Sequence, residues 1–268
     1  MKIILSRKGF DSSNGGCANP ILPDGTLLSM PIPSDDKAKY RDLSYNGMGY
    51  DQILSDINPN PARKYNHCHV DPDIRKGIRI KEVSGWKPGF GQGGAAQGTL
   101  AKAGVEKGDI FLFFGWFRQT EYRDGKLQFV KRNNGDFYHY ADLQVIYGYM
   151  QIGDILTDKK EIAEYKWHPH ASSQNKNNTI YIPSKKLSLN RKKDGYGVLD
   201  YRKDRVLTQY GQNRGTWEAY PFLMPEHIYG DRKNSAKNGG LYYCGIWQEM
   251  VIYESEGLIE WVKKILKE

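Results

Sequence analysis

The first sixteen residues contain several side chains that could bind an anionic ligand and exchange protons with it. Residues 2–5 form a short apolar run typical of a buried strand, and a polar, glycine-bearing loop follows at once. Ligand-binding groups are common where a strand ends in flexible backbone. An ordinary strand and turn is the competing interpretation. The predicted substrate-binding residues of this segment are Ser6, Arg7, Lys8, Ser12 and Asn14, with Asp11 as a catalytic acid or base.

Three residues far along the chain complete the predicted catalytic set. His168 and His170 flank a proline in a polar segment, and Glu249 lies in an apolar run near the C-terminus. Histidine changes charge near neutral pH, so it can accept or donate a proton during a reaction. The sequence contains no nucleophile elbow, Walker loop or complete metal motif, so it does not define the reaction type.

A second histidine segment raises the question of a metal. His67, His69 and Asp71 alternate, so on an extended chain they share one face and could supply half a metal site, with His168 and His170 completing it across the fold. The alternative is a turn at residues 71–73 with hydrogen-bonded histidines. We adopt the alternative and predict no bound metal, and the residues indicate no particular cofactor.

Residues 89–94 match the pattern G-x-G-x-x-G, which in dinucleotide-binding folds lies between a strand and a helix. Trp86 and Pro88 interrupt the tight turn that such a fold needs, and the expected acidic residue after the next strand is missing. We therefore expect a glycine-rich loop that closes over a substrate. A half-buried strand is expected before it at 78–83, and a helix after it at 95–103.

The remaining pattern predicts an α+β fold that is mainly β. Residues 110–117 are almost continuously apolar, as in a central strand, and 127–130 and 143–155 continue an antiparallel meander. Glycines 148 and 153 suggest bulges, which favour a strongly curved antiparallel sheet or a small barrel with long loops. Residues 255–267 have the periodicity of an amphipathic C-terminal helix, with Ser255 as its expected N-cap. No linker or repeat is evident, so residues 1–268 are expected to form a single domain.

Charge and composition favour an anionic partner. The chain has 268 residues, with 39 Lys and Arg against 31 Asp and Glu, a net charge of +8. Nucleotides or nucleic acids suit such a balance, and Trp116 could stack on a base.

No run of apolar residues is long enough to cross a membrane, and we expect a cytoplasmic protein. A solvated loop or a phosphate-binding segment would explain a basic run that includes Lys185, Lys186, Arg191, Lys192 and Lys193.

Several of these segments together resemble the nucleotide-modification-associated domain 3 family. The resemblance rests on residues 6–12, 15–16, 20–25, 69–73, 108–117 and 168–170. It implies a context of DNA base modification or phage defence, and therefore DNA as the favoured nucleic acid, without implying a particular reaction. Residues 108–117 and 148–155 also resemble, locally, the PUA-like barrels of EVE and ASCH domains, which hold modified or flipped bases.

Two main functions follow as hypotheses. The first is an enzyme that acts on a nucleotide or a nucleic-acid base through the loop at residues 6–12. The second is a reader that binds a modified base or nucleotide in a PUA-like pocket without transforming it. An accessory structural protein is a third possibility. The sequence does not indicate the substrate or the oligomeric state.

Overall fold

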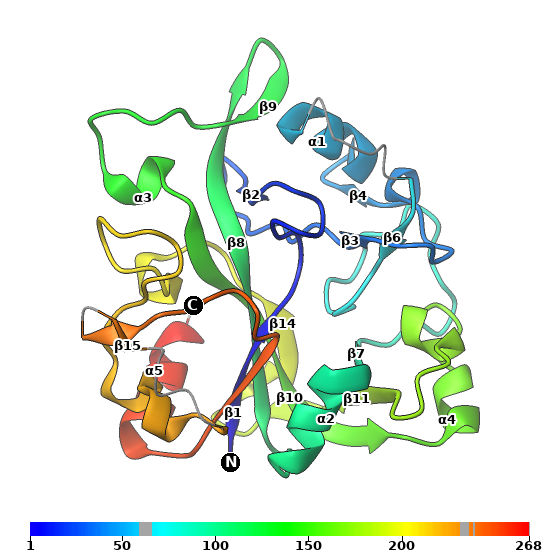
Figure 1. Cartoon of the computed structure of the whole chain (residues 1–268). Coiled ribbons are helices and arrows are strands. Elements are labelled where there is room, and N and C mark those ends of the chain that lie inside the picture. Colours follow the sequence, from blue (N-terminus) through cyan, green and yellow to red (C-terminus); the bar gives the residue numbers. More distant parts are fainter. Residues whose placement is uncertain (59–65, 231–235, 238, 268) are drawn as a thin grey trace.

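A strongly curled sheet forms the frame of the computed structural model, which describes residues 1–58, 66–230, 236–237 and 239–267 (Figure 1). Among these residues, nine strands join in one sheet, and six of them form its main path. In order, these six are β17 (Glu249–Ile252), β1 (Ile3–Arg7), β8 (Ile110–Arg123), β10 (Leu143–Leu156), β11 (Thr179–Pro183) and β7 (Phe90–Gln92). The other three are β2 (Asn19–Ile21) and β9 (Lys126–Phe129), which pair with β8, and β14 (Tyr196–Val198), which pairs with β10.

The predicted neighbours at the centre of the sheet are confirmed. β8 and β10 pair antiparallel, and the register shifts between Ile146 and Gly148, close to one of the glycines expected to mark a bulge. A second shift, between Ile152 and Asp154, affects the pairing of β10 with β11. β1 and β2 run parallel to β8, so the sheet is mixed at this side. The bulges increase the local twist, which helps the sheet to curl into a half-barrel.

Both faces of the central strands are buried, which explains why their sequence is continuously apolar rather than alternating. One face carries Phe111 and Phe113, which contact Phe90 with ring centres 4.8 and 5.2 Å apart. The other face carries Phe114, which packs against Trp217 with ring centres 5.2 Å apart. Helix α5 (Glu256–Ile265) covers this second side, and the Ser255 side chain caps it by accepting from the amide of Leu258, as predicted.

Shorter elements surround the sheet. The helix expected at residues 95–103 is present as α2. The helices other than α5 are α1 (Tyr50–Ile57), α2 (Gly94–Lys102), α3 (Phe137–Tyr140) and α4 (Lys159–Ala163), with 3-10 turns at Tyr40–Asp42, Pro169–Ser172, Lys203–Arg205, Pro221–Leu223 and Pro225–His227. Small strand pairs are β3 (Ile32–Pro33) with β6 (Cys68–His69), β4 (Ser44–Tyr45) with β5 (Met48–Gly49), β12 (Lys186–Leu187) with β13 (Asn190–Asp194), and β15 (Ala236–Lys237) with β16 (Gly240–Leu241). No described helix has the length and apolarity to span a bilayer.

The strand predicted at 78–83 is wrong. Only Arg79 makes a bridge there, to Leu43, and its guanidinium turns back to hold the buried carboxylate of Asp73 at 2.7 and 3.0 Å. Ile80 remains 63% exposed. The alternation of apolar and charged residues at 78–83 therefore does not mark a strand with one buried face. It reflects the ion pair between Arg79 and Asp73 and the exposed side chain of Ile80.

Curling brings the two ends of the sheet path together. β7 and β17 lie at opposite ends of that path and share no backbone pairing. Nevertheless the Gln92 side chain on β7 donates a hydrogen bond of 2.7 Å to Glu249 on β17. The half-barrel is therefore joined across its open side by polar side chains, and the candidate functional residues gather at this point.

Candidate functional site

The polar contact between the sheet edges, which we call the seam, consists of Ser6, Lys8, Gln92 and Glu249. Glu249 Oε1 lies 3.4 Å from Lys8 Nζ and accepts hydrogen bonds from Ser6 Oγ at 2.9 Å and from Gln92 Nε2 at 2.7 Å. Lys8 Nζ also lies 4.3 Å from the centre of the Phe90 ring, a cation–π contact. Glu249 and Lys8 are only 3% and 7% exposed, so a charged pair is buried inside the half-barrel.

Burial raises the pKa of the Glu249 carboxyl, and the Lys8 charge and the hydrogen bonds from Ser6 and Gln92 oppose that rise. All of these partners contact Oε1, while Oε2 is buried without a hydrogen-bond partner among the described residues. A buried carboxyl with a raised pKa and a free oxygen has the properties of a general acid or base.

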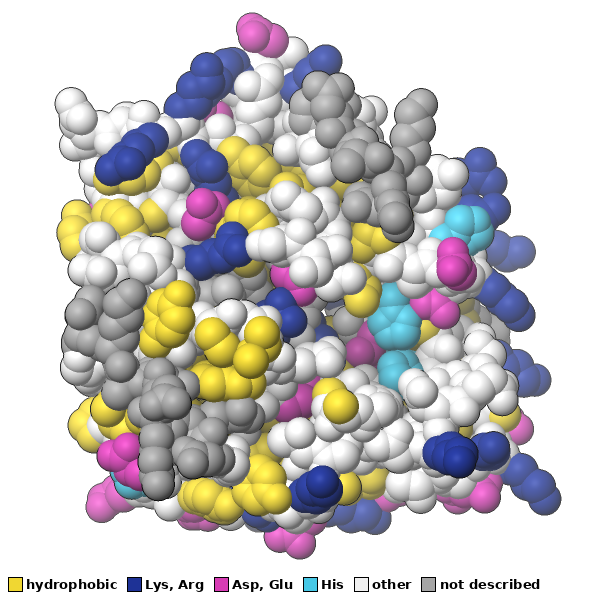
Figure 2. Space-filling model, viewed as in Figure 1, with side chains coloured by type: hydrophobic (Ala, Val, Ile, Leu, Met, Phe, Trp, Pro, Cys, Tyr) yellow, Lys and Arg dark blue, Asp and Glu magenta, His cyan; other side chains and the backbone are white. Residues whose placement is uncertain are grey.

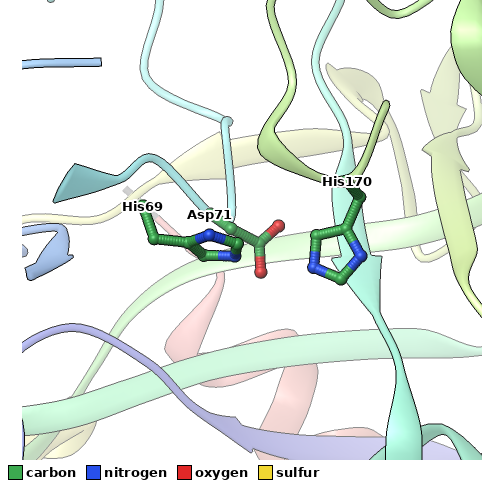
Figure 3. Close-up of side chains that lie close together, drawn as sticks. All are labelled: His69, Asp71 and His170. Atoms are coloured by element: carbon green, nitrogen blue, oxygen red, sulfur yellow. The ribbon is translucent and has the colours of Figure 1, made fainter. Parts of the chain in front are cut away.

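A second group, the histidine cluster, lies beside the seam and consists of His69, Asp71 and His170. One ligand atom from each residue lies within 4.8 Å of the others. The Asp71 carboxylate lies between the two imidazole rings, and each ring turns the nitrogen farther from its Cβ toward that carboxylate (Figure 3). Histidine, acidic and basic side chains gather around a depression near the middle of this face of the molecule (Figure 2).

Each member of the cluster is held by a neighbour. His69 Nδ1 contacts Asp36 Oδ2 at 2.7 Å, and His170 Nδ1 contacts Asn178 Oδ1 at 2.6 Å. Asp71 Oδ1 accepts a 2.7 Å hydrogen bond from the amide of Gly91. These contacts come from segments far apart in the chain, so the cluster depends on the complete fold.

His168 supports Asp71 from behind. Its Nε2 lies 3.3 Å from Asp71 Oδ1 without the alignment of a hydrogen bond, and its Nδ1 accepts from the amide of His170. Burial opposes ionisation of Asp71, but the contact with His168 and the charge of Lys8 outweigh it and hold the pKa of Asp71 well below its usual range. Lys8 therefore acts electrostatically on both the seam and the cluster. Burial lowers the pKa of His170, against the attraction of Asp71.

Gly91 allows the strand β7 to lie directly against the cluster. A Cβ at this position would lie 2.2 Å from Cδ2 of His170 and 2.9 Å from Cε1 of His168. The expectation of a glycine-rich loop over a substrate is therefore wrong for Phe90–Gln92, which form a strand paired with β11. The glycine is needed for close approach to the histidine rings, a reason that the sequence pattern alone does not reveal.

The loop that follows β1 lines a cavity of about 510 Å³ on the other side of the strand. We call it the loop cavity. Arg7 and Asp11 line it and form an ion pair, with Nη1 and Oδ2 2.6 Å apart. The Arg214 guanidinium lies 3.8 Å from the centre of the Trp116 ring, and its Nη2 donates a 2.6 Å hydrogen bond to Ser12 Oγ. The cavity thus contains a flat stacked pair with cationic character beside hydroxyl and carboxylate groups.

The structure separates the predicted site residues into three places. Arg7, Asp11, Ser12 and Trp116 line the loop cavity. Asn14 contacts the Asp11 carboxylate through its amide at 3.2 Å. The alternation of side chains along β1 sends Ser6 and Lys8 to the opposite face, where they join Glu249. Of the predicted catalytic residues, Glu249, His168 and His170 therefore lie near the seam, whereas Asp11 does not.

The predicted nucleic-acid-binding residues form a third group, on the β12–β13 hairpin. Lys186 pairs with Asp194 across the hairpin at 2.7 Å. Four of the five basic side chains are exposed and Lys193 is half-buried: Lys185, Lys186, Arg191, Lys192 and Lys193.

Sequence reasoning missed Asp36, Gln92 and Arg214. Asp36 and Arg214 lie in polar segments without periodicity, and Gln92 occupies a variable position of the G-x-G-x-x-G pattern at residues 89–94. Their partners are remote: Arg214 contacts a residue 202 positions away, and Gln92 one that is 157 positions away. No local signal identifies such pairs.

A glycine-to-alanine comparison tests the packing of β7 against the histidines. We expect Gly91→Ala to lower the free energy of unfolding by about 1–3 kcal/mol, because the added methyl overlaps rings that the core holds in place. The matched control is Gly98→Ala in α2, where a Cβ meets nothing within 4 Å. Alanine there should stabilise the helix by about 0.5–1 kcal/mol. Urea unfolding followed by circular dichroism measures both, and equal effects would contradict the assigned role of Gly91.

The comparisons with known proteins agree with the resemblance noted in the sequence. A family model described as nucleotide modification associated domain 3 matches residues 2–252. No curated protein and no solved structure matches the chain. The matched range includes the loop cavity, the seam and the histidine cluster. The chain belongs to the nucleotide modification associated domain 3 family.

Proposed function

We propose that the protein is an enzyme that acts on a nucleotide or a nucleic-acid base, and that the substrate binds in the loop cavity. The observation that carries the proposal is the stack of Arg214 on Trp116, 3.8 Å from guanidinium to ring centre, at the wall of a cavity of about 510 Å³. Flat cationic and aromatic groups are the usual partners of bases and phosphates. The family description and the net charge of +8 support the same substrate class.

Two polar atoms of the cavity residues have unused hydrogen-bonding capacity. Gln144 Oε1 and Arg7 Nε are buried and have no hydrogen-bond partner among the described residues, and both residues line the loop cavity. Buried polar atoms without partners are uncommon in native proteins. A base edge offers donors and acceptors side by side, which is the complement that an amide oxygen and a guanidinium N–H require.

Proton transfer is assigned to Asp11 within the cavity and to Glu249 behind its wall. Arg7 links the two regions, because its amide donates a 2.9 Å hydrogen bond to the carbonyl of Gln248, next to Glu249. Tyr243 lines the cavity, and burial raises its pKa. The charge of Arg7 lowers this pKa, whereas the charges of Glu249 and Asp11 raise it further. Both carboxylates thus act on one residue of the cavity wall. His168 supports the histidine cluster by holding Asp71.

A reader is the second candidate, and the same stack favours it. Arg214 on Trp116 provides a platform that would hold a modified base without any chemical step. Under this alternative, the buried charges of the seam stabilise the fold around the pocket and take no part in turnover.

The loop-cavity proposal predicts selective effects on binding. Trp116→Ala should weaken nucleotide binding about 10-fold or more, because base stacking contributes about 1–3 kcal/mol. Arg7→Ala should weaken it as well, because it removes a guanidinium that can bind the anionic ligand. Tyr253→Ala, an exposed aromatic residue, is the control and should leave affinity unchanged. Isothermal titration of nucleoside mono- and triphosphates measures the affinities. Equal affinity in wild type and both cavity variants would refute the proposed pocket.

A measurement of turnover distinguishes the enzyme hypothesis from the reader hypothesis. Nucleotides and oligonucleotides incubated with the protein are analysed by mass spectrometry, with Asp11→Asn in parallel. An enzyme predicts a product that disappears in this variant while some binding remains. Binding without any product in the wild type would favour the reader.

The basic hairpin is proposed to contact the phosphate backbone of a nucleic acid, with DNA as the expected one because the resemblance in the sequence implies a context of DNA base modification. Contacts to about four phosphates give a log–log salt slope of about −3 to −4 on duplex DNA. Replacing Lys185, Lys186, Lys192 and Lys193 with alanine should flatten this slope and weaken binding equally on all sequences. Fluorescence-anisotropy titrations at several salt concentrations provide the measurement, with Arg7→Ala as the control that keeps the slope. A wild-type protein without affinity at low salt would instead indicate a free nucleotide as substrate.

A further inference from the structure

The facing atoms of the histidine cluster are all hydrogen-bond acceptors. Each imidazole turns the nitrogen farther from its Cβ, which is Nε2, toward the Asp71 carboxylate (Figure 3). An ionised carboxylate only accepts hydrogen bonds, so the state of the cluster depends on whether the two Nε2 atoms carry protons. For a neutral ring, the partner of Nδ1 determines which nitrogen carries the proton.

For His170 the hydrogen bonds select one tautomer. Asn178 Nδ2 donates a 2.9 Å hydrogen bond to the carbonyl of His170, which can only accept, so Asn178 Oδ1 is the atom that lies 2.6 Å from His170 Nδ1. Because Oδ1 is an acceptor, the proton must be on Nδ1. The Nε2 of a neutral His170 therefore carries a lone pair and faces Asp71.

For His69 a carboxylate has the same effect. Asp36 Oδ2 lies 2.7 Å from His69 Nδ1 and also accepts from Ser34 Oγ at 2.7 Å. The proton of a neutral His69 thus lies on Nδ1, and its Nε2 is also a lone-pair donor. A carboxylate or an amide oxygen behind the Nδ1 atom is the arrangement that orients metal-binding histidines in proteins.

We propose that His69, Asp71 and His170 bind a divalent first-row transition-metal ion through two imidazole nitrogens and one carboxylate oxygen. With both imidazoles neutral and no cation between them, two lone pairs and a negative oxygen face one another within 4.8 Å. A cation at their centre converts this unfavourable arrangement into three attractive contacts. Lys8 does not take this place, because its Nζ lies 3.4 Å from Glu249 Oε1 in the seam.

The spacing of the atoms suits such an ion. Three ligand atoms about 2.0–2.2 Å from one metal lie about 3.3–3.8 Å apart in a tetrahedral or trigonal arrangement, so atoms within 4.8 Å of one another need to approach by at most about 1–1.5 Å, which rotation of the side chains can supply. Imidazole nitrogens favour zinc, copper, iron or nickel over calcium and magnesium, which prefer all-oxygen sites. Three protein ligands leave open positions for water or a substrate, as in catalytic sites, while structural zinc sites use four.

The second contacts of Asp71 fit this role. The Gly91 amide and His168 both contact Oδ1, at 2.7 and 3.3 Å, and hold the carboxylate in one orientation. The metal site does not depend on the proposed nucleotide substrate, since the loop cavity lies on the other face of β1. Metal binding and nucleotide binding can therefore be tested separately.

The test measures binding of cobalt(II) and zinc(II) to full-length protein that has been freed of metal by a chelator. Cobalt(II) reports on its ligands through visible absorption, and isothermal titration gives the stoichiometry and the affinity. We expect one ion per chain, a cobalt spectrum typical of mixed nitrogen and oxygen ligands, and a higher Tm in the presence of zinc. A wild-type protein that binds neither ion stoichiometrically would overturn the proposal.

Variants locate the site. Asp71→Asn and His170→Ala should lower the affinity at least about 100-fold, and Asn178→Ala, which only positions His170, about 10- to 100-fold. His69→Gln removes a ligand whose side chain is 23% exposed, so this variant should keep the fold if the two buried replacements do not. His139→Ala, an exposed histidine, is the matched control. Retained affinity in a folded His69→Gln, or an equal loss in the control, would contradict the assigned ligands.

Discussion

The buried contact between Lys8 and Glu249 is the interaction on which the organisation of this protein depends. Each charge would cost several kcal/mol to bury alone, and the cost is offset only where the pair is close and well hydrogen-bonded. Ser6 and Gln92 supply these additional hydrogen bonds to Glu249. Because β7 and β17 are the two ends of the sheet path, the hydrogen bond from Gln92 to Glu249 also joins the edges of the half-barrel. The residues of the seam therefore contribute to the stability of the fold and also belong to the candidate functional site.

Two sites of different chemistry surround this contact. On one face of β1, Lys8 acts on both Glu249 and Asp71, which couples the seam to the histidine cluster electrostatically. On the other face, Arg7 pairs with Asp11 in the loop cavity. Consecutive residues of one strand thus reach two sites because their side chains alternate. This arrangement explains why the end of a single five-residue strand carries so many polar groups.

The local sequence pattern was sufficient to predict the central strands of the sheet and the C-terminal helix. The apolar run at 110–117, the glycines near the bulges of β10 and the Ser255 cap each predicted the structure that is observed, because burial, bulges and capping depend on neighbouring residues. The curvature was also predictable, although the parallel pairing of β1 with β8 was not. Parallel pairing depends on the long connection between two strands, which leaves little signal in either one.

The candidate site was predictable only in its parts. The sequence indicated Arg7, Asp11 and Glu249 as functional candidates, yet it gave no reason to join Lys8 with a residue more than 240 positions away. The sequence suggested half a metal site at His67, His69 and Asp71, with His168 and His170 as its possible completion. In the structure His69, Asp71 and His170 lie together, whereas His67 contacts the backbone carbonyl of residue 36 and His168 lies behind Asp71. Such groupings depend on how the sheet curls, so tertiary structure had to supply them.

A double-mutant cycle on the seam tests the central claim most directly. The unfolding free energies of wild type, Lys8→Met, Glu249→Gln and the double variant are compared. Each single replacement leaves a buried polar group without its partner and should cost about 3–5 kcal/mol, whereas the double variant should cost clearly less than the sum, with a coupling of about 2 kcal/mol or more. Single variants within about 0.5 kcal/mol of wild type, or additive effects, would contradict a fold whose organisation depends on this pair.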